Sequence, residues 1–260
     1  MTKNVVLLST HFVNDFIIQK YRKLYNDLGS GKYDIILLFN IDEDYLWNIP
    51  NDISIYTINC ERINELGYEP IEETLLPGSC HFPVLRFYND NPSYRFYWFI
   101  EYDVDFTGNW SVFIKDCSEN LSEYDFLSSH IERFDEVKNV NWPWWYRSNY
   151  VGMELKDCIK GFNPICRYSN EALLFIDSYQ KKAYSAHSEV LITTSLYHGG
   201  FRIGDFGGKG EFVPHGYEYK YYLPNLKYIN DGTIRYRPIY TRKDIELIGL
   251  QNTLFHPIKQ

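Results

Sequence analysis

The segment YRFYWFIEYDVD, at residues 94–105, decides the fold that the sequence predicts. Its first half is a run of aromatic and aliphatic side chains, which indicates a central strand buried on both faces. Three carboxylates, Glu101, Asp103 and Asp105, follow within five residues. Because side chains two positions apart point to the same side of an extended chain, we expect Asp103 and Asp105 to act together at the end of this strand.

The region before this segment predicts a strand, a helix and two more strands. A continuous apolar run at residues 5–8 indicates a buried strand, and apolar side chains recur at helical spacing over residues 16–28. Further strands are expected at residues 33–39 and 53–58. A strand, a helix and a second strand of these lengths form a right-handed crossover with parallel strands, so the sequence predicts an α/β fold.

Polar residues follow the first two predicted strands. Ser9 and Thr10 stand at the end of the first strand, and Asn40 stands at the end of the second. In open α/β sheets ligands bind beyond the carboxyl ends of the strands, so we expect these three residues to contact a bound ligand. The phosphate-binding motifs GxGxxG and GxxxxGK[ST] do not occur in the sequence, and neither a dinucleotide-binding fold nor a P-loop is predicted.

The second half of the chain has a mixed pattern. It predicts a strand at residues 124–127, a helix at 170–181, a short strand at 182–185 and a second helix at 187–198. The tail from Phe201 is rich in glycine and tyrosine, and we expect it to form loops over a site rather than part of a core.

Composition and charge exclude several classes of protein. At 260 residues the chain can form a single large core, and its net charge of −8 disfavours a general nucleic-acid-binding protein, which needs a positive surface. Five cysteines without a CxxC pair argue against a thiolate metal site or a disulfide framework and favour the reducing cytoplasm. No stretch approaches the ~18 apolar residues of a membrane span, so we expect at most peripheral membrane contact.

The carboxylates after the central strand point to a metal ion. Two hard oxygen ligands such as Asp103 and Asp105 suit Mg²⁺ or Mn²⁺, which proteins hold with one or two carboxylates plus the phosphates of a substrate. A D-x-D triplet also occurs by chance in solvated turns. Its place directly after a buried strand, about 100 residues into an α/β chain, favours the metal site.

Two further segments carry groups with possible chemistry. Glu189, at the start of a predicted helix, can serve as a general base, although an acidic residue in that position also simply favours the helix dipole. In the C-terminal segment, His256 can be a third metal ligand and Lys259 can meet a phosphate. His215 competes with His256 for the role of metal ligand.

Taken in order, these blocks resemble the GT-A glycosyltransferases, the fold class of many nucleotide-diphospho-sugar transferases, and among them poorly characterised bacterial and fungal families. The matching blocks are the β-α-β start, residues 98–105, residues 167–169, residues 187–189 and residues 256–259. The resemblance implies a central mixed, mostly parallel sheet flanked by helices. It also implies that Asp103 and Asp105 form the DxD metal motif, that Glu189 is the catalytic base of an xED motif, and that His256 is the C-terminal metal-binding histidine.

The same resemblance assigns the two halves of a single domain, residues 1–260. Residues of about 1–110 would bind the nucleotide sugar, with Lys259 on its phosphates, and residues of about 111–260 would bind the acceptor. Arg167 and Ser169, which precede the acceptor helix in the family, and His187 beside the proposed base would contact the sugar or the acceptor. The Gly-rich donor loop that is usual after the third strand has only a loose counterpart in residues 77–79.

The hypothesis from the sequence is a cytoplasmic, metal-dependent hexosyltransferase. Its donor would be UDP- or GDP-linked and its acceptor a saccharide or lipid-linked saccharide, as in the assembly of surface polysaccharides. If the reaction inverts the anomeric centre, Glu189 deprotonates the acceptor, whereas in a retaining enzyme Glu189 would position the acceptor or the donor.

Two alternatives stay open. A metal-dependent nucleotidyltransferase or phosphohydrolase would also use Asp103 and Asp105. A non-catalytic sugar-binding protein would explain the aromatic content of 18%, for which a tyrosine-rich core is the simpler explanation.

Overall fold

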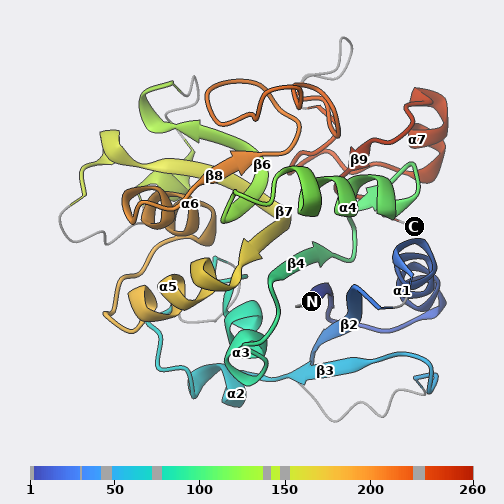
Figure 1. Cartoon of the computed structure of the whole chain (residues 1–260), viewed down its shortest axis with the longest axis horizontal. Coiled ribbons are helices and arrows are strands. Elements are labelled where there is room, and N and C mark those ends of the chain that lie inside the picture. The colour runs from blue at the N-terminus through green and yellow to red at the C-terminus, as the bar shows by residue number, and fades with distance from the viewer. Residues whose placement is uncertain are drawn as a thin grey trace.

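A seven-stranded sheet runs through the centre of the computed structural model (Figure 1). The structure describes residues 3–29, 31–41, 49–71, 78–136, 142–146, 153–224 and 232–259. The strands of this sheet are β1 (Asn4–Thr10), β2 (Tyr33–Asn40), β3 (Ile55–Ile58), β4 (Phe96–Glu101), β6 (Phe126–Arg133), β7 (Ile159–Ser169) and β8 (Ile203–Asp205). Two short strands, β5 (Asp105–Phe106) and β9 (Leu254–Phe255), form a second sheet beside it.

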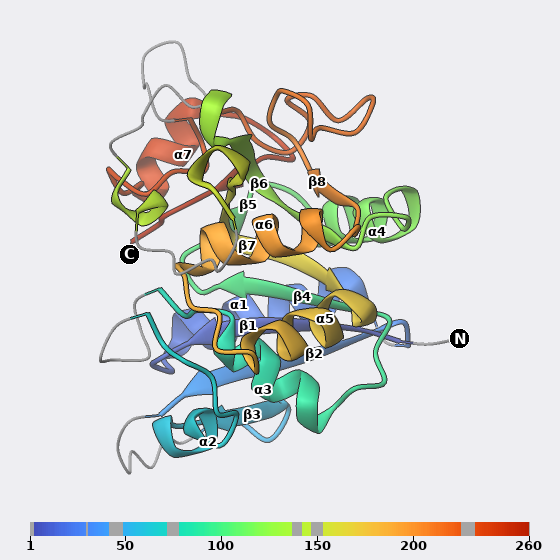
Figure 2. The ribbon, with the colours of Figure 1, turned by 90° about the vertical axis from the view of Figure 1, so that its left-hand side faces the viewer.

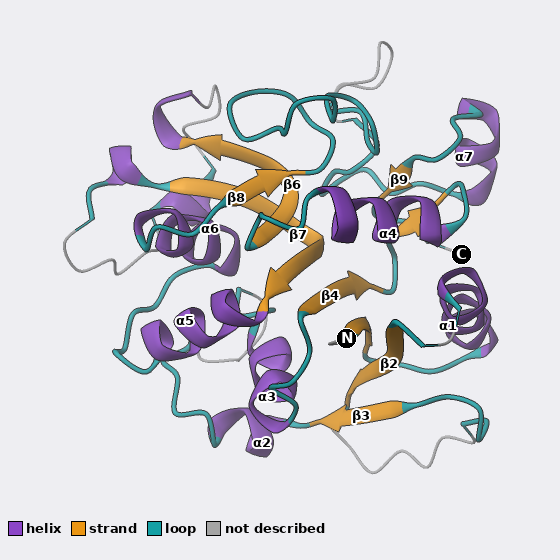
Figure 3. Ribbon diagram, in the orientation of Figure 1, coloured by secondary structure: helices purple, strands orange, loops and turns teal. Residues whose placement is uncertain are grey.

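Helices connect and cover these strands, as Figure 3 shows by colour. The α-helices are α1 (Asp15–Leu28), α2 (Cys60–Asn64), α3 (Phe82–Asp90), α4 (Trp110–Asn120), α5 (Asn170–Gln180), α6 (Ser188–His198) and α7 (Arg242–Ile248). Short 3-10 helices occupy η1 (Phe134–Glu136), η2 (Pro143–Trp145) and η3 (Leu155–Asp157).

The large sheet is mixed but mostly parallel, as the sequence predicts. Its strand order is β3-β2-β1-β4-β7-β6-β8. The first four strands in this order are parallel to one another. β7 is antiparallel to both β4 and β6, and β8 is parallel to β6. The carboxyl ends of β1, β2, β3 and β4 therefore lie at one edge, where ligands of open α/β sheets bind.

Alternating side chains of the strands divide the core into two layers. On β1, Val5 and Leu7 pack with α3, α5 and α6, whereas Val6 and Leu8 pack with α1 and α4. Figure 2 views the sheet from the side that α3, α5 and α6 cover. Burial on both faces explains why β1 and β4 are continuous apolar runs rather than alternating ones. The layering is the expected α/β arrangement.

Several elements differ from their predicted bounds. The helices predicted at 170–181 and 187–198 are confirmed as α5 and α6, and β6 extends well past its predicted end. The strand predicted at 182–185 is wrong, because α5 ends in a tight turn in which the amides of Lys182 and Ala183 bond to carbonyls of the last helical turn, and Ala183 has a φ of 60°.

The glycine- and tyrosine-rich tail contributes to the core, which corrects the expectation that it forms only loops over a site. Tyr217, Tyr221 and Tyr222 are buried in the layer around α1 and α4. The ring of Tyr221 lies 4.8 Å from that of Phe113 in an edge-to-face contact. Aromatic side chains supply apolar area wherever they lie in the sequence, so a lack of periodicity did not prevent burial.

None of the helices within the described residues is long and apolar enough to cross a membrane.

Candidate metal centre

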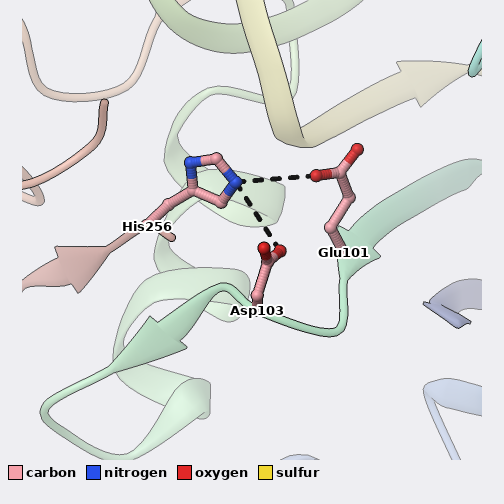
Figure 4. A group of neighbouring side chains, drawn as sticks. All are labelled: Glu101, Asp103 and His256. Atoms are coloured by element: carbon pink, nitrogen blue, oxygen red, sulfur yellow. Dashed lines mark ion pairs between the residues drawn. The ribbon is translucent and has the colours of Figure 1, made fainter. Parts of the chain in front are cut away.

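Glu101, Asp103 and His256 converge on one point beyond the carboxyl end of β4 (Figure 4). The Nε2 atom of His256 lies 3.6 Å from a carboxylate oxygen of Glu101 and 3.6 Å from Oδ1 of Asp103. These separations are too long for hydrogen bonds. They suit ligands that each stand about 2.0–2.3 Å from one shared metal ion.

The backbone sets the tautomer of His256. Its Nδ1 lies 2.7 Å from the carbonyl oxygen of Arg235. A carbonyl oxygen only accepts hydrogen bonds, so in the neutral ring Nδ1 carries the proton and Nε2 presents a lone pair toward the two carboxylates. Metal-binding histidines in proteins usually have this arrangement, with the second nitrogen donating to a carbonyl or carboxylate.

A turn brings the two carboxylates together. The amide of Val104 donates to the carbonyl of Glu101 at 3.1 Å, which closes a turn over Glu101–Val104 and folds Asp103 back beside Glu101. The sequence analysis assumed an extended chain here, in which Asp103 and Asp105 would point the same way. Because the chain turns instead, the partner of Asp103 in this trio is Glu101.

Asp105 lies outside the trio. It begins β5, which pairs with β9, and its Oδ2 lies 3.7 Å from a guanidinium nitrogen of Arg242. Lys20, buried on α1, lies within reach of the charges of both aspartates: the pKa of its ammonium is lowered to about 8 by burial, an effect that Asp105 and Asp103 partly offset. The role of Asp105 as a metal ligand therefore stays a prediction.

The chemistry of the trio fits a divalent cation. The Oδ1 atom of Asp103 is buried and has no hydrogen-bond partner among the described residues. A buried carboxylate oxygen without a partner is costly unless something fills its place. Two carboxylates and one imidazole are ligands that Mn²⁺ and several other divalent metals accept. Within the described parts of the chain, these three residues form the group that could hold an ion.

Glu189, at the start of α6, lies near enough to Glu101 for the charge of Glu101 to act on its carboxyl group. The pKa of its carboxyl group is raised to about 8, first by burial and then by the charge of Glu101, against the opposing effects of Lys160 and the backbone of Asn163. Its side chain is 16% exposed. A carboxyl group with a pKa in this range can exchange a proton with a substrate near neutral pH, as acid–base catalysts do.

His187 is the N-cap of α6 and lies next to Glu189. Its Nδ1 accepts the amide proton of Glu189 at 3.3 Å, and its ring stacks on Trp144 with centroids 4.3 Å apart. Burial lowers the pKa of His187 to about 4, so the ring is neutral at pH 7. The first amides of α6 are bonded within the protein, since that of Ser188 donates to the carbonyl of Gly78. This helix start offers a carboxylate to the site rather than an anion-binding cradle.

The predicted residues at the ends of β1 and β2 lie at the same edge of the sheet. Ser9 pairs with Glu101 in the register of β1 and β4. Thr10 is buried, and its hydroxyl bonds to the backbone of Phe12. The Oδ1 atom of Asn40 is buried and has no hydrogen-bond partner among the described residues. Ser9 is therefore the one of the three that adjoins the trio directly.

An aromatic cluster stands beside this edge and was not predicted. The rings of His11, Phe12 and Tyr102 contact one another edge to face, with centroids 5.0–5.3 Å apart. His11 is exposed, and Tyr102 lies between the two ligands Glu101 and Asp103. The spread of these residues between β1 and the turn after β4 explains why no local pattern revealed the cluster.

The side chain of Arg167 is bonded to backbone carbonyls in the core. It is fully buried in β7, and its guanidinium donates to the carbonyl oxygens of Cys117 and Leu121 at the end of α4 and of Tyr124 just beyond. Ser169 caps α5 by accepting the amide proton of Ala172. The structure brings neither residue to the trio, and their predicted contacts with substrate stay untested.

The remaining predicted residues lie near the C-terminus or apart from the site. Lys259 is exposed, and its amide donates to the carbonyl of Tyr240. His215 is exposed in a turn, and the group of three metal-ligand side chains found among the described residues contains His256 instead. Pro77, part of the loose donor-loop candidate, lies outside the described residues.

Comparisons with known proteins give matches in fold and not in sequence. No protein-family model matches the chain, and no curated protein matches it. The structure of the galactosyltransferase LgtC in complex with donor and acceptor sugar analogs is similar with a TM-score of 0.46 at 10% identity, over 79% of this chain and 74% of that one.

Two further solved structures are similar at the same identity. Mouse xyloside xylosyltransferase 1 in its apo form has a TM-score of 0.39 over 83% of this chain and 90% of that one, at 10% identity. The core-mannan synthase A from Aspergillus fumigatus in its Mn/GDP form has a TM-score of 0.38 over 79% of this chain and 73% of that one, at 10% identity. These likenesses concern the fold alone.

A thermal-shift experiment tests the metal centre. We expect Mn²⁺ at about 100 times its Kd to raise the Tm by roughly 5–10 °C, because a ligand that binds only the folded state stabilises it. Asp103→Asn and His256→Ala should abolish this shift, whereas the matched control His215→Ala should keep it. If the trio holds the ion, Asp105→Asn should keep the shift, whereas a loss of the shift would favour the set of Asp103, Asp105 and His256. A shift that survives Asp103→Asn would exclude the trio.

The pKa of Glu189 predicts a pH-dependent gain in stability for Glu189→Gln in EDTA. The carboxyl group is protonated in the folded protein up to about pH 8 but ionises near 4.5 in the unfolded chain. The folded state therefore binds more protons between these values, and the wild type loses stability as the pH rises through this window, by about 1.4 kcal/mol per unit at most. Glutamine does not titrate, so the variant should match the wild type near pH 4.5 and exceed it by pH 8.5. Urea titration at several pH values measures this. A difference in the free energy of unfolding that is the same at every pH in this range would contradict the raised pKa of Glu189.

The environment of Arg167 predicts a large loss of stability for Arg167→Met. The substitution removes the guanidinium donor from three carbonyl oxygens. Those of Cys117 and Leu121 keep a backbone amide donor and that of Tyr124 loses its side-chain donor, which should lower the free energy of unfolding by about 2 kcal/mol or more. The control Arg202→Met removes an exposed guanidinium that lies 5.0 Å from the ring of Tyr124, and should change it by less than about 1 kcal/mol. Urea titration measures both, and an unchanged midpoint for Arg167→Met would argue for a role other than structure.

Proposed function

We propose that this chain is a metal-dependent glycosyltransferase that moves a sugar from a nucleoside-diphosphate donor to a saccharide-like acceptor. The observation that carries the proposal is the convergence of Glu101, Asp103 and His256 at the carboxyl end of β4, with the buried carboxyl group of Glu189 within reach of the charge of Glu101. A cation site for a diphosphate and a base for an acceptor hydroxyl are the two functions that sugar transfer from such a donor requires.

The donor binds on the side of β1 and β2. Ser9 and Asn40 supply polar groups there, and the cluster of His11, Phe12 and Tyr102 supplies ring surfaces beside the cation site. This side belongs to residues 1–110, the proposed nucleotide-sugar half. The exposed Lys259 follows the ligand His256 by three residues and is available to a phosphate of the donor.

Glu101, Asp103 and His256 hold the cation, with Asp105 close by as a further carboxylate. When bound, the ion neutralises charge on the leaving diphosphate. Mn²⁺ suits this set better than Mg²⁺, because Mg²⁺ prefers oxygen ligands alone and the set includes an imidazole. The lone pair of His256 is held in place by its bond to Arg235, so the ring needs no rearrangement to bind.

Glu189 acts on the acceptor. In its ionised form it takes the proton from the attacking hydroxyl, which becomes a better nucleophile, and the reaction inverts the anomeric centre in a single displacement. A base whose own pKa is near 8 holds that proton well at neutral pH. In a retaining reaction the same carboxylate would position the acceptor or the donor.

The acceptor binds on the side of residues 111–260. Glu189 and His187 stand there beside Trp142 and Trp144, and indole rings pack against the apolar faces of sugars. A saccharide or a lipid-linked saccharide, as in the assembly of surface polysaccharides, fits this side. Among the described residues Cys80, Cys117, Cys158 and Cys166 are free thiols, which supports work in a reducing compartment such as the cytoplasm.

The aromatic content does not favour a simple sugar-binding protein. Much of it is in the core, where Trp98, Trp110 and Trp145 are fully buried. A nucleotidyltransferase or phosphohydrolase would share the cation site. Glu189, a buried carboxyl group with a raised pKa, favours an acceptor that must lose a proton.

Calorimetric titration of UDP and GDP, with and without Mn²⁺, tests the donor site. We expect one of the two to bind only with Mn²⁺, and we expect Asp103→Asn and Glu101→Gln to remove this dependence. Glu189→Gln should still bind the nucleotide but lose at least about 100-fold in sugar transfer, because the base acts on the acceptor.

This titration and a product assay separate the alternatives. Release of a sugar phosphate and a nucleoside monophosphate from a nucleotide sugar, or of pyrophosphate or phosphate from a nucleoside triphosphate, rather than of a nucleoside diphosphate from a nucleotide sugar, would favour a phosphoryl-transfer enzyme. No binding of either nucleotide under any condition would contradict the UDP- or GDP-linked donor.

A further inference from the structure

Lys20 is a lysine on the buried face of α1. Its neighbours on this face of the helix, Ile17, Tyr21 and Leu24, belong to the core, and Lys20 is only 7% exposed. A lysine ammonium seldom lies in such a place unless its hydrogen bonds and charge are compensated. The groups that compensate it therefore show what the residue does.

The ammonium of Lys20 bonds to the turn that carries the proposed metal ligands. It donates to the carbonyl oxygen of Tyr102 at 2.9 Å and to that of Val104. These are the two residues on either side of Asp103. The contact joins a helix near the N-terminus to a turn more than 80 residues later, so local chain geometry does not impose it.

The other two carbonyls of the turn also have donors. That of Glu101 accepts from the amide of Val104, and that of Asp103 accepts from the amide of Ile258 at 2.9 Å. All four carbonyls between Glu101 and Val104 are thus bonded, two of them by one side chain. Buried backbone groups need partners, so removing the Lys20 ammonium frees the backbone on both sides of Asp103.

We propose that Lys20 is a positioning residue of the cation site, whose ammonium fixes the backbone at Tyr102 and Val104 so that the Asp103 carboxylate points toward Glu101 and His256. This inference rests on the proposed cation site. Lys20 does not contact the ion and supplies no ligand atom.

A role of Lys20 through its charge and a role in holding the turn predict opposite changes in metal affinity when the residue is removed. An ammonium near a divalent cation repels it, so if Lys20 acted through charge alone its removal would tighten metal binding. If it acts by holding the turn, its removal lets Asp103 move and weakens binding. Residues that orient metal ligands in proteins change metal affinity about 10–100-fold when they are mutated.

The experiment is Mn²⁺ binding by calorimetry and by the electron paramagnetic resonance signal of free Mn²⁺, on variants shown by circular dichroism to be folded at the working temperature. We expect Lys20→Met and Lys20→Gln to bind Mn²⁺ at least about 10-fold more weakly than the wild type. Lys20→Arg keeps a cation and donors and should lose less. The matched control Lys23→Met removes an exposed lysine from the same helix and should bind Mn²⁺ as the wild type does.

Two results would overturn the proposal, and they differ in what else they exclude. Unchanged or tighter Mn²⁺ binding in either folded variant, with a wild type that binds and an Asp103→Asn variant that does not, excludes the positioning role of Lys20 but leaves the cation site intact. A wild type that does not bind Mn²⁺ excludes the cation site and the role of Lys20 together. Lys20→Gln keeps the test decisive if Lys20→Met does not fold.

Discussion

The turn between β4 and β5 is the constraint on which the rest of the site depends. It reverses the chain directly after the central strand, so that Asp103 returns to Glu101 instead of continuing away from it. The turn is held by three parts of the chain: its own Val104 amide, Lys20 of α1, and the amide of Ile258. The first lies within the turn, and the other two come from the beginning and the end of the sequence. The position of one carboxylate is thus a property of the whole fold.

The C-terminal segment, which carries His256, completes this arrangement. Leu254–Phe255 pairs with Asp105–Phe106, and His256 is held between the carbonyl of Thr233 and the backbone of Arg235. The same few residues that bring the imidazole to the site also close the backbone of the turn. The positions of His256 and Asp103 are therefore coupled. A change in the C-terminal segment should also shift Asp103, although it does not alter that side chain.

The sequence predicted the elements better than the contacts between them. The strands β1, β2 and β4 and the helices α1, α5 and α6 follow from apolar runs and helical spacing, which are local properties. Glu189 at a helix start and His256 near the C-terminus could be singled out by residue type. The pairing of Asp103 with Glu101 could not, because a pair of aspartates at i and i+2 resembles a ligand pair only if the chain stays extended. The bonds that reach the turn from outside it come from Ile258 and Lys20, about 150 and 80 residues away in the sequence, where no local pattern reveals them.

The charged residues around the site bear on how a donor diphosphate and a cation would bind there. Glu101 and Asp103 lie side by side in the trio, and burial together with the charge of Glu101 raises the pKa of Glu189 to about 8. Among the described residues nearby, Lys20 is bonded to backbone carbonyls, Lys160 is paired with Glu132, and Arg242 lies beside Asp105. His187 is neutral because burial lowers its pKa to about 4. An anionic diphosphate would meet the carboxylates of Glu101 and Asp103 at this point. The exposed Lys259 and Arg237, whose charge acts on Tyr102, supply positive charge beside them, and a bound cation would offset the carboxylates themselves. On the proposed function, this is why donor binding and cation binding are coupled.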